Sequence, residues 1–140
     1  MTILRYSADK DNTISDAYKS DLSGTATGSN MGLADALHIF SIYGQTSGSA
    51  GFSKELSRAI IKFPVTGTNS IEEDRDNGVI PASGSVSFYL NLYNAVSTDP
   101  LPKEFTINLY AIDQSWVEGD GLDMSSYKDI GASNWEDRLP

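Results

Sequence analysis

Two stretches with a strict alternation of apolar and polar side chains constrain the fold of this chain most. They are residues 85–93, SVSFYLNLY, and residues 104–112, EFTINLYAI. A two-residue period is typical of a β-strand that buries one face. Asp99-Pro100 and Pro102 lie between the stretches, and proline can turn a chain but cannot continue a strand ladder. The sequence therefore predicts two neighbouring antiparallel strands joined by a long loop.

The alternation also predicts which side chains the two strands bury. A shift by one residue turns every side chain to the other face, so only one register buries the whole apolar row. On the opposite face, tyrosines can stack on sugar rings, pack against protein or be covered by a second layer of the same fold; they are Tyr89, Tyr93 and Tyr110. The buried row is expected to be Val86, Phe88, Leu90, Leu92, Phe105, Ile107 and Leu109.

Shorter segments on the N-terminal side complete the prediction of an all-β chain. The Gly-rich residues 20–35 are expected to form a loop that packs on the sheet edge through Leu22, Met31 and Leu33. Strands are expected over residues 2–8, 13–19, 36–43 and 57–65, with turns at 9–12 and 71–78.

Bulky apolar residues provide candidate assembly anchors. Residues 36–43 are apolar on both faces, so this strand should lie between layers or against another subunit. Its Phe40 and Ile42 are therefore candidate anchors. Trp116 and Trp135 are bulky anchors in the irregular last part of the chain.

Composition agrees with one domain of this class. The 140 residues include twelve glycines and five prolines, and 39% are hydrophobic, which is typical of a chain with many turns and few long helices. A chain of this length forms a single core, so residues 1–140 are expected to be one domain. The predicted fold class is an antiparallel, jelly-roll-like β-sandwich with long Gly- and Ser-rich loops.

Charge and hydropathy argue against two classes of partner. Nineteen acidic and ten basic residues give a net charge of −9 without any basic cluster, which argues against nucleic acid. No apolar run is long enough to span a bilayer, and the first residues lack the apolar stretch of a signal peptide. We therefore expect no membrane partner, and synthesis in a cytoplasm.

Nothing in the sequence indicates catalysis. The one histidine, His38, lies in an apolar segment, and the chain has no cysteine. A nucleophile elbow, a phosphate loop and an HExxH sequence are also lacking. A satisfied structural histidine is the simpler interpretation of His38. We therefore predict no enzyme and no cofactor.

Clustered carboxylates raise the alternative of a calcium site. Glu118, Asp120 and Asp123 lie in a Gly-containing turn, and oxygen ligands at such spacing can hold calcium. Residues 72–78 also bring carboxylates together. Neither segment has the glycine and glutamate pattern of a calcium-binding loop. A solvated turn is therefore the preferred interpretation of both.

The order of the segments resembles a known family. Four stretches are similar to DNRLRE-type jelly-roll β-sandwiches, which are related to some carbohydrate-binding modules, in the version found in structural proteins of tailed phages, marine ones especially. The stretches are residues 29–44 (SNMGLADALHIFSIYG), 57–65 (SRAIIKFPV), 80–95 (IPASGSVSFYLNLYNA) and 114–129 (QSWVEGDGLDMSSYKD). The shared features fall on Gly32, on Arg58 with Phe63, on Trp116 with Glu118, and on Asn134 with Trp135.

The resemblance implies a non-enzymatic structural protein of a phage virion, such as a capsid decoration, neck or fibre-attachment component, assembled in the host bacterial cytoplasm. Its partners are expected to be other virion proteins and copies of itself, with the anchors Phe40, Ile42, Trp116 and Trp135. The alternative is a carbohydrate-binding module, with or without calcium, that uses Tyr89, Tyr93, Tyr110 and Trp116. The family continues beyond its Asn-Trp segment, so the last strands of the sandwich are expected to be missing from residues 1–140.

Overall fold

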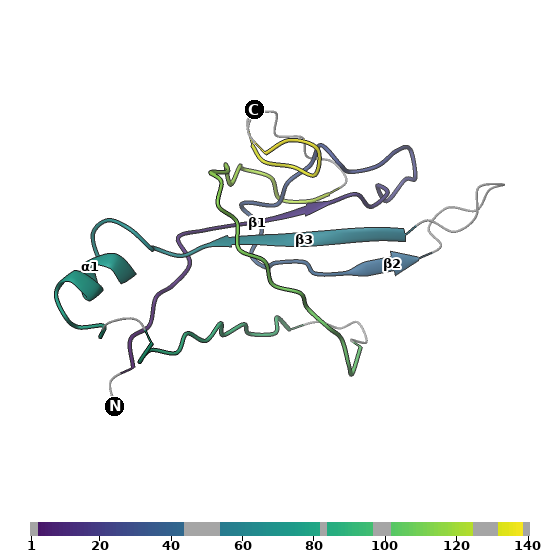
Figure 1. The fold of residues 1–140 in the computed structure, drawn as a ribbon. Helices are drawn as coiled ribbons and strands as arrows, with labels where there is room; N and C mark the ends of the chain where they lie inside the picture. The colour runs from purple at the N-terminus through teal and green to yellow at the C-terminus, as the bar shows by residue number, and fades with distance from the viewer. Residues whose placement is uncertain (1–2, 44–53, 82–83, 97–101, 125–131, 139–140) are drawn as a thin grey trace.

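The structure is built on a small antiparallel sheet surrounded by long loops (Figure 1). The computed structural model describes residues 3–43, 54–81, 84–96, 102–124 and 132–138. Within these residues β3 lies between β1 and β2, and both pairings are antiparallel. The described part of the chain therefore has a β-type fold with little helix. Its elements are β1 (Lys10–Ser15), β2 (Ser41–Tyr43), β3 (Lys54–Lys62) and α1 (Ile71–Asp76).

The central position of β3 follows from its sequence, KELSRAIIK, which has apolar side chains on both faces. In its pairing with β1, Ile14 lies opposite Arg58 and Thr13 lies opposite Ala59. Directly opposed residues share a face of the sheet. Ile14 and Arg58 therefore lie on one face, and Thr13 and Ala59 lie on the other.

The strand boundaries differ from the sequence-based prediction. The turn expected at residues 9–12 is wrong, because β1 already pairs with β3 from Lys10. The described residues 3–8 form no strand. β2 covers only the last part of the predicted 36–43 strand and lies at the edge of the sheet. Just before β2, the Phe40 carbonyl still accepts from the Ser57 N–H at 3.1 Å, but the Phe40 N–H donates to the Ser57 hydroxyl at 2.8 Å instead of to a backbone carbonyl.

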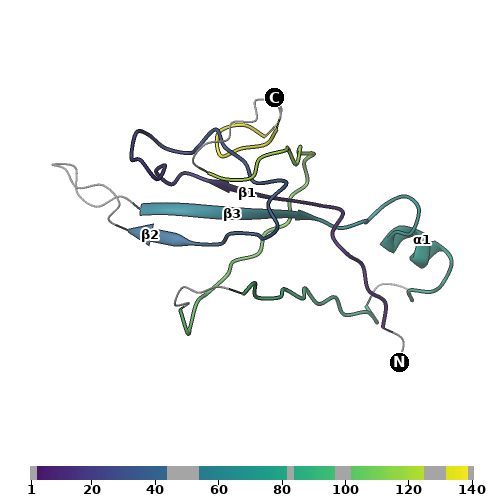
Figure 2. The ribbon, with the colours of Figure 1, turned by 180° about the vertical axis from the view of Figure 1, so that it is seen from behind.

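The two most regular stretches of the sequence do not join the sheet. We call residues 84–96 and 102–112 the two extended segments. Figures 1 and 2 show residues 84–96 running apart from the sheet, and the chain after residue 102 returning to cross one of its faces. Among the described residues, none of 86–96 and none of 102–112 makes a backbone hydrogen bond. The prediction of two paired neighbouring strands is therefore wrong for this chain alone.

The predicted buried row is exposed for the same reason. Phe88 is 60% exposed and Phe105 is 72% exposed, where both were expected to be buried. Leu90, Leu92, Ile107 and Leu109 are exposed as well, and Val86 is half-buried. A strand buries its apolar face only if another layer packs on it, and no described part of the chain buries this row.

Three segments far apart in sequence pack together beside β1. They are residues 26–33, 116–121 and 132–138. The Trp135 N–H donates to the Thr27 carbonyl at 3.0 Å, and the Ser133 N–H donates to the Val117 carbonyl at 3.0 Å. The Leu33 N–H donates to the Gly121 carbonyl at 2.9 Å. Backbone hydrogen bonds therefore join these loops without forming a regular strand.

The buried interior of the described residues is small and largely polar. Met31 from the Gly-rich loop is buried as expected, whereas Leu22 and Leu33 are exposed. The largest fully buried side chains include Glu55, Asn12 and Asn30. Burial removes the hydrogen bonds that these polar groups would make to water, so hydrogen bonds within the protein must replace many of them. The buried hydrophobic residues are Ile14, Ala17, Ala26, Met31, Ile80 and Ala132.

Helix α1 replaces most of the turn predicted at residues 71–78. Ser70 is its N-cap, and its hydroxyl accepts a hydrogen bond from the Glu73 N–H at 3.1 Å. The Glu73 carboxylate in turn accepts a hydrogen bond from the Asn69 N–H. This exchange is close to a capping box, which satisfies N–H groups that a helix leaves without partners. No described helical segment is long and apolar enough to cross a membrane.

Tyr6 ties the N-terminal segment to α1 and makes stability dependent on pH. Its hydroxyl donates to the Asp74 carboxylate, and this bond, aided by burial and by the charge of Asp74, raises the pKa of Tyr6 to about 12. The ordinary pKa of tyrosine is about 10. Because the folded state favours the neutral phenol, the bond stabilises it fully below pH 10, and this contribution is lost as the pH rises from about 10 through about 12.

The tyrosinate absorbance of Tyr6 is the difference between the titrations of the unmodified chain and of Tyr6→Phe. We expect this difference to titrate with a midpoint near 12. In Asp74→Asn, which keeps an acceptor but removes the charge, this midpoint should fall toward about 10. Between about pH 10 and pH 12, the free energy of unfolding of Tyr6→Phe should also fall less than that of the unmodified chain. A Tyr6 midpoint near 10 in the unmodified chain would contradict the assignment.

Candidate functional site

Trp116 and Trp135 line the same hollow on one face of the sheet. Its volume is about 250 Å³. The Arg58 guanidinium carbon lies 4.1 Å from the centre of the Trp135 ring, which is cation–π geometry. Apolar side chains from β1, β3 and the second extended segment complete the lining: Ile14, Ile60 and Ile112.

The other wall of the hollow is a short C-terminal loop fixed by hydrogen bonds. The Asn134 side-chain oxygen accepts from the N–H groups of Glu136 and Asp137, both at 2.8 Å. The Thr27 hydroxyl donates to the Glu136 carboxylate at 2.8 Å. Arg138 donates to the Ser115 carbonyl at 2.7 Å. The hollow therefore combines an aromatic and aliphatic lining with a charged rim, which suits an apolar or planar group.

The four predicted assembly anchors fall into two separate places. Ile42 lies opposite Glu55 in the β2–β3 pairing. Successive residues of a strand point to opposite faces, so Ile42 faces away from the side of Arg58 and the tryptophan hollow. Phe40 lies just before β2 and Ile42 lies within it, and both are half-buried. Only Trp116 and Trp135 therefore come together, and nothing in the sequence indicated that they share a site.

The tyrosines predicted as a sugar-binding surface do not line that hollow. Tyr89, Tyr93 and Tyr110 lie on the extended segments and are 83%, 92% and 84% exposed. Trp116 lines the hollow with Trp135, and none of the three tyrosines does. The predicted set of four aromatic residues is therefore not one binding site in this structure.

The carboxylates of the calcium alternative are not gathered around a common point. Glu118 accepts a hydrogen bond from the Asp11 N–H at 2.7 Å. Burial raises the pKa of Asp11, and the nearby negative charge of Glu118 raises it further. Asp120 and Asp123 are exposed. Within the described residues no group of three or more His, Cys, Asp or Glu side chains can hold a metal ion, so Glu118 acts as a structural acceptor for β1.

Sequence analysis missed a buried polar junction that holds the loops on β1. We define it as Asn12, Asn30, Met31, Gly121 and Ser133. The Asn12 side chain donates to the Ser133 carbonyl at 3.0 Å and accepts from the Met31 N–H at 3.0 Å. The Asn30 side-chain oxygen accepts from the Gly121 N–H at 2.8 Å. Both asparagines are 0% exposed.

Glycines are the sequence signal that could have revealed this junction. A Cβ atom on Gly32 would overlap the backbone of Glu118 and Gly119. A Cβ atom on Gly121 would overlap the carbonyl and side-chain oxygens of Asn30. Glycine permits such close approach of two backbones, so SNMG and EGDG mark the two loops that meet.

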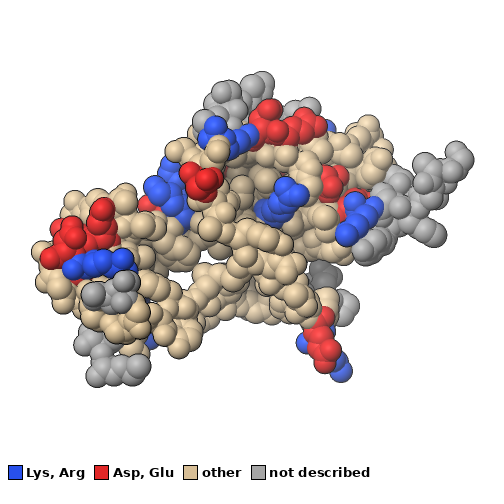
Figure 3. All heavy atoms as spheres, viewed as in Figure 1, with Lys and Arg blue, Asp and Glu red and all other residues tan. Residues whose placement is uncertain are grey.

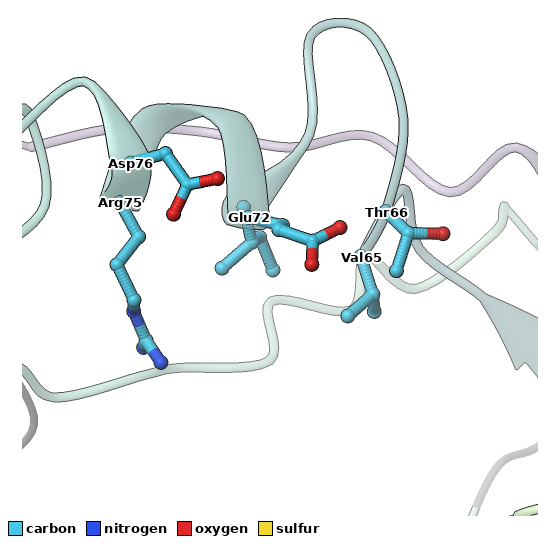
Figure 4. A pocket seen from close by; sticks show the side chains of 6 residues that line it. Val65, Thr66, Glu72, Arg75 and Asp76 are labelled. Carbon is cyan, nitrogen blue, oxygen red and sulfur yellow. The ribbon is translucent and has the colours of Figure 1, made fainter.

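A second hollow lies beside α1, with a volume of about 300 Å³ (Figure 4). Val65 and Thr66 come from the chain that follows β3, and Glu72, Arg75 and Asp76 come from the helix. In Figure 4 the Glu72 carboxylate points toward Thr66, while the Arg75 side chain extends away from both. Its lining contains no aromatic ring, and its apolar side chains are Val65 and Ile71 alone. It is therefore a weaker candidate than the tryptophan hollow.

His38 is exposed and lies outside the strands. Its backbone N–H donates to the Thr13 hydroxyl at 3.1 Å, and its carbonyl accepts from the Ser57 hydroxyl at 2.7 Å. Its backbone, not its imidazole, therefore links the loop to the sheet in the described interactions.

No protein-family model, curated protein or solved structure matches this chain. Its function is therefore inferred from the surfaces that it exposes.

Exposed apolar side chains concentrate on the two extended segments. Eleven of the nineteen exposed large hydrophobic residues of the described chain lie there. Residues 77–98 contain no charged residue, although the whole chain has a net charge of −9. Figure 3 shows charged side chains over α1 and around the sheet, with mostly uncharged surface along the lower part of the view. The eleven are Phe88, Tyr89, Leu90, Leu92, Tyr93, Val96, Phe105, Ile107, Leu109, Tyr110 and Ile112.

Proposed function

We propose that this chain is a structural protein of a phage virion that acts by protein–protein assembly. The observation that carries the proposal is the pair of extended segments, which expose large apolar side chains and whose residues 86–96 and 102–112 make no backbone hydrogen bond among the described residues. Leaving apolar surface in water costs about 25 cal/mol per Å². Large exposed apolar patches on soluble proteins are typical of interaction sites. A neighbouring polypeptide that covers the segments would remove this cost.

A phage particle is the assembly that the sequence favours. Residues 29–44 and 80–95 resemble jelly-roll domains of tailed-phage structural proteins, and the net charge of −9 fits a protein that stays soluble before assembly. In this proposal the β1-β3-β2 sheet belongs to one layer of a jelly-roll-like sandwich. The extended segments are strands that pair on assembly. Capsid decoration, neck and fibre attachment all fit such a component.

Carbohydrate binding is the second candidate, and the tryptophan hollow is the observation that favours it. Indole rings can stack on sugar rings, and Trp116 and Trp135 line one hollow of about 250 Å³. Sugar stacking depends on one or two aromatic platforms, whereas an assembly interface depends on a wider patch with a few anchors. Trp116→Ala should therefore abolish glycan-array binding if the chain is a carbohydrate-binding module.

For the assembly function, we expect Phe88→Ala or Phe105→Ala to weaken incorporation into particles about tenfold or more. A buried aromatic anchor typically contributes roughly 2 kcal/mol to an interface. The measurement is the ratio of variant to unmodified chain in purified particles after competition between the two. Leu33→Ala is the matched control, because Leu33 is 57% exposed but lies outside the extended segments. Its ratio should stay near that of the unmodified chain.

Two outcomes would contradict assembly through these segments. One is equal incorporation of the Phe88→Ala, Phe105→Ala and Leu33→Ala variants. The other is a defined glycan bound by the unmodified chain and lost in Trp116→Ala while incorporation stays unchanged. The second outcome would assign the chain to carbohydrate binding.

A further inference from the structure

We propose that two copies of this chain pair through residues 86–92, as antiparallel strands related by a two-fold axis at Tyr89. The inference rests on the proposed assembly function and names one partner of the first extended segment. Residues 86–92 make no backbone hydrogen bond among the described residues. An extended segment with free N–H and C=O groups is a template for pairing with another strand.

Charge favours a second copy as the occupant. Two chains of net charge −9 repel each other, so a contact between them should fall on an uncharged surface. Residues 77–98 are the longest stretch of the sequence without an acidic or basic side chain. A strongly charged partner would gain no ion pair there. The second extended segment suits self-pairing less, because it begins with Lys103 and Glu104.

The order of side chains selects one register. Directly opposed residues share a face in an antiparallel pair, so apolar residues must lie opposite apolar residues. With Tyr89 on the axis, Phe88 lies opposite Leu90 and Val86 lies opposite Leu92, in both directions. Ser87 then lies opposite Asn91 on the other face.

Neighbouring registers fit less well. An axis at Phe88 would leave Leu92 opposite Gly84, and an axis at Leu90 would leave Val86 opposite Asn94. An axis between two residues would set apolar residues against polar ones. The Tyr89 register alone gives all four apolar residues of the row an apolar partner.

Single cysteines can test this register, because the unmodified chain contains none. Opposed residues of antiparallel strands have Cα atoms about 4.5 to 5.5 Å apart, within the reach of a disulfide at about 7 Å. Under mild oxidation, full-length Tyr89→Cys should therefore form a covalent dimer. Asn91→Cys alone should not, since its two copies would be four residues apart, about 13 Å along the strand. A mixture of Ser87→Cys and Asn91→Cys should cross-link only as the mixed dimer.

Charge substitutions give a second test that does not depend on disulfide geometry. Ser87→Asp combined with Asn91→Asp places carboxylates opposite each other twice and should raise the dimer Kd about fivefold. Ser87→Lys combined with Asn91→Asp places opposite charges there and should restore dimerisation. Sedimentation of the unmodified chain should also show a stronger dimer at higher salt, which screens the repulsion between the two acidic chains.

The outcomes separate this inference from the proposed function. Efficient cross-linking of Asn91→Cys with itself would overturn the register. A monomer in sedimentation, together with no cross-linking of Tyr89→Cys, would overturn the pairing. If Phe88→Ala still reduces incorporation into particles in that case, the assembly function stands and its partner at residues 86–92 is another virion protein.

Discussion

Replacing Gly121 by alanine should lower the free energy of unfolding by about 3 kcal/mol or more, because the added methyl group has no space. Gly121 is buried, and its Cβ would overlap both the carbonyl oxygen and the side-chain oxygen of Asn30. The residue is held from both sides, since its N–H donates to Asn30 at 2.8 Å and its carbonyl accepts from Leu33 at 2.9 Å. Relief of the overlap therefore requires the two loops to separate.

Gly28→Ala is the matched control for this prediction. A Cβ at Gly28 would meet no atom within 4 Å, so its effect should stay within about 0.5 kcal/mol. Urea unfolding of the unmodified chain and both variants measures the difference. Equal midpoints for Gly121→Ala and Gly28→Ala would show that residues 30 and 121 do not meet as described.

Local pattern was enough to predict the β-type fold, but the strand predicted at residues 57–65 is β3 at Lys54–Lys62, three residues earlier at both ends. The sequence KELSRAIIK leads into Phe63-Pro64, and a strand ladder ends where proline removes the N–H donor. Helix α1 was also within reach of the sequence, because Ser70 and Glu73 have the spacing of a capping box. The density of acidic residues at 72–76 was instead interpreted as a solvated turn.

The alternation of apolar and polar residues could not predict whether the extended segments are paired and buried. The pattern of Val86, Phe88, Leu90 and Leu92 specifies which face of a strand is apolar, but not what covers that face. Burial is a property of the neighbour as much as of the segment. The same limit applies to Trp116 and Trp135, which are nineteen positions apart in the printed sequence and share a hollow only because both loops pack on β1.

The polar junction was hidden for a different reason. Asparagine is usually exposed or found in turns, so neither Asn12 nor Asn30 was a candidate for burial. Their positions depend on backbone groups of Met31, Gly121 and Ser133, which no side-chain pattern reveals. Only the close-packed glycines of the two loops give a local sign of the contact.

Asn12→Ala should lower the free energy of unfolding by about 2 to 4 kcal/mol. The Asn12 side chain satisfies two backbone groups, the Ser133 carbonyl and the Met31 N–H. A buried polar group without a partner costs about 1 to 3 kcal/mol. Asn94→Ala is the control, because Asn94 is exposed on the first extended segment and should change stability by less than about 0.5 kcal/mol. Similar unfolding midpoints for the two variants would contradict the role assigned to Asn12.

Asn12→Asp separates the lost hydrogen bonds from the lost volume. The introduced carboxyl group keeps the size of the Asn12 side chain and can still accept from the Met31 N–H, but when ionised it places a negative oxygen against the Ser133 carbonyl. The folded state should therefore favour the protonated form, which can donate to that carbonyl, and the pKa of the introduced carboxyl group should rise above about 3.9. Because this folded-state pKa is raised, the variant should come closest to the unmodified chain below about pH 4, and its deficit should grow as the pH increases toward 7. A deficit that is the same at both ends of this range would show that the side chain at position 12 does not face Ser133.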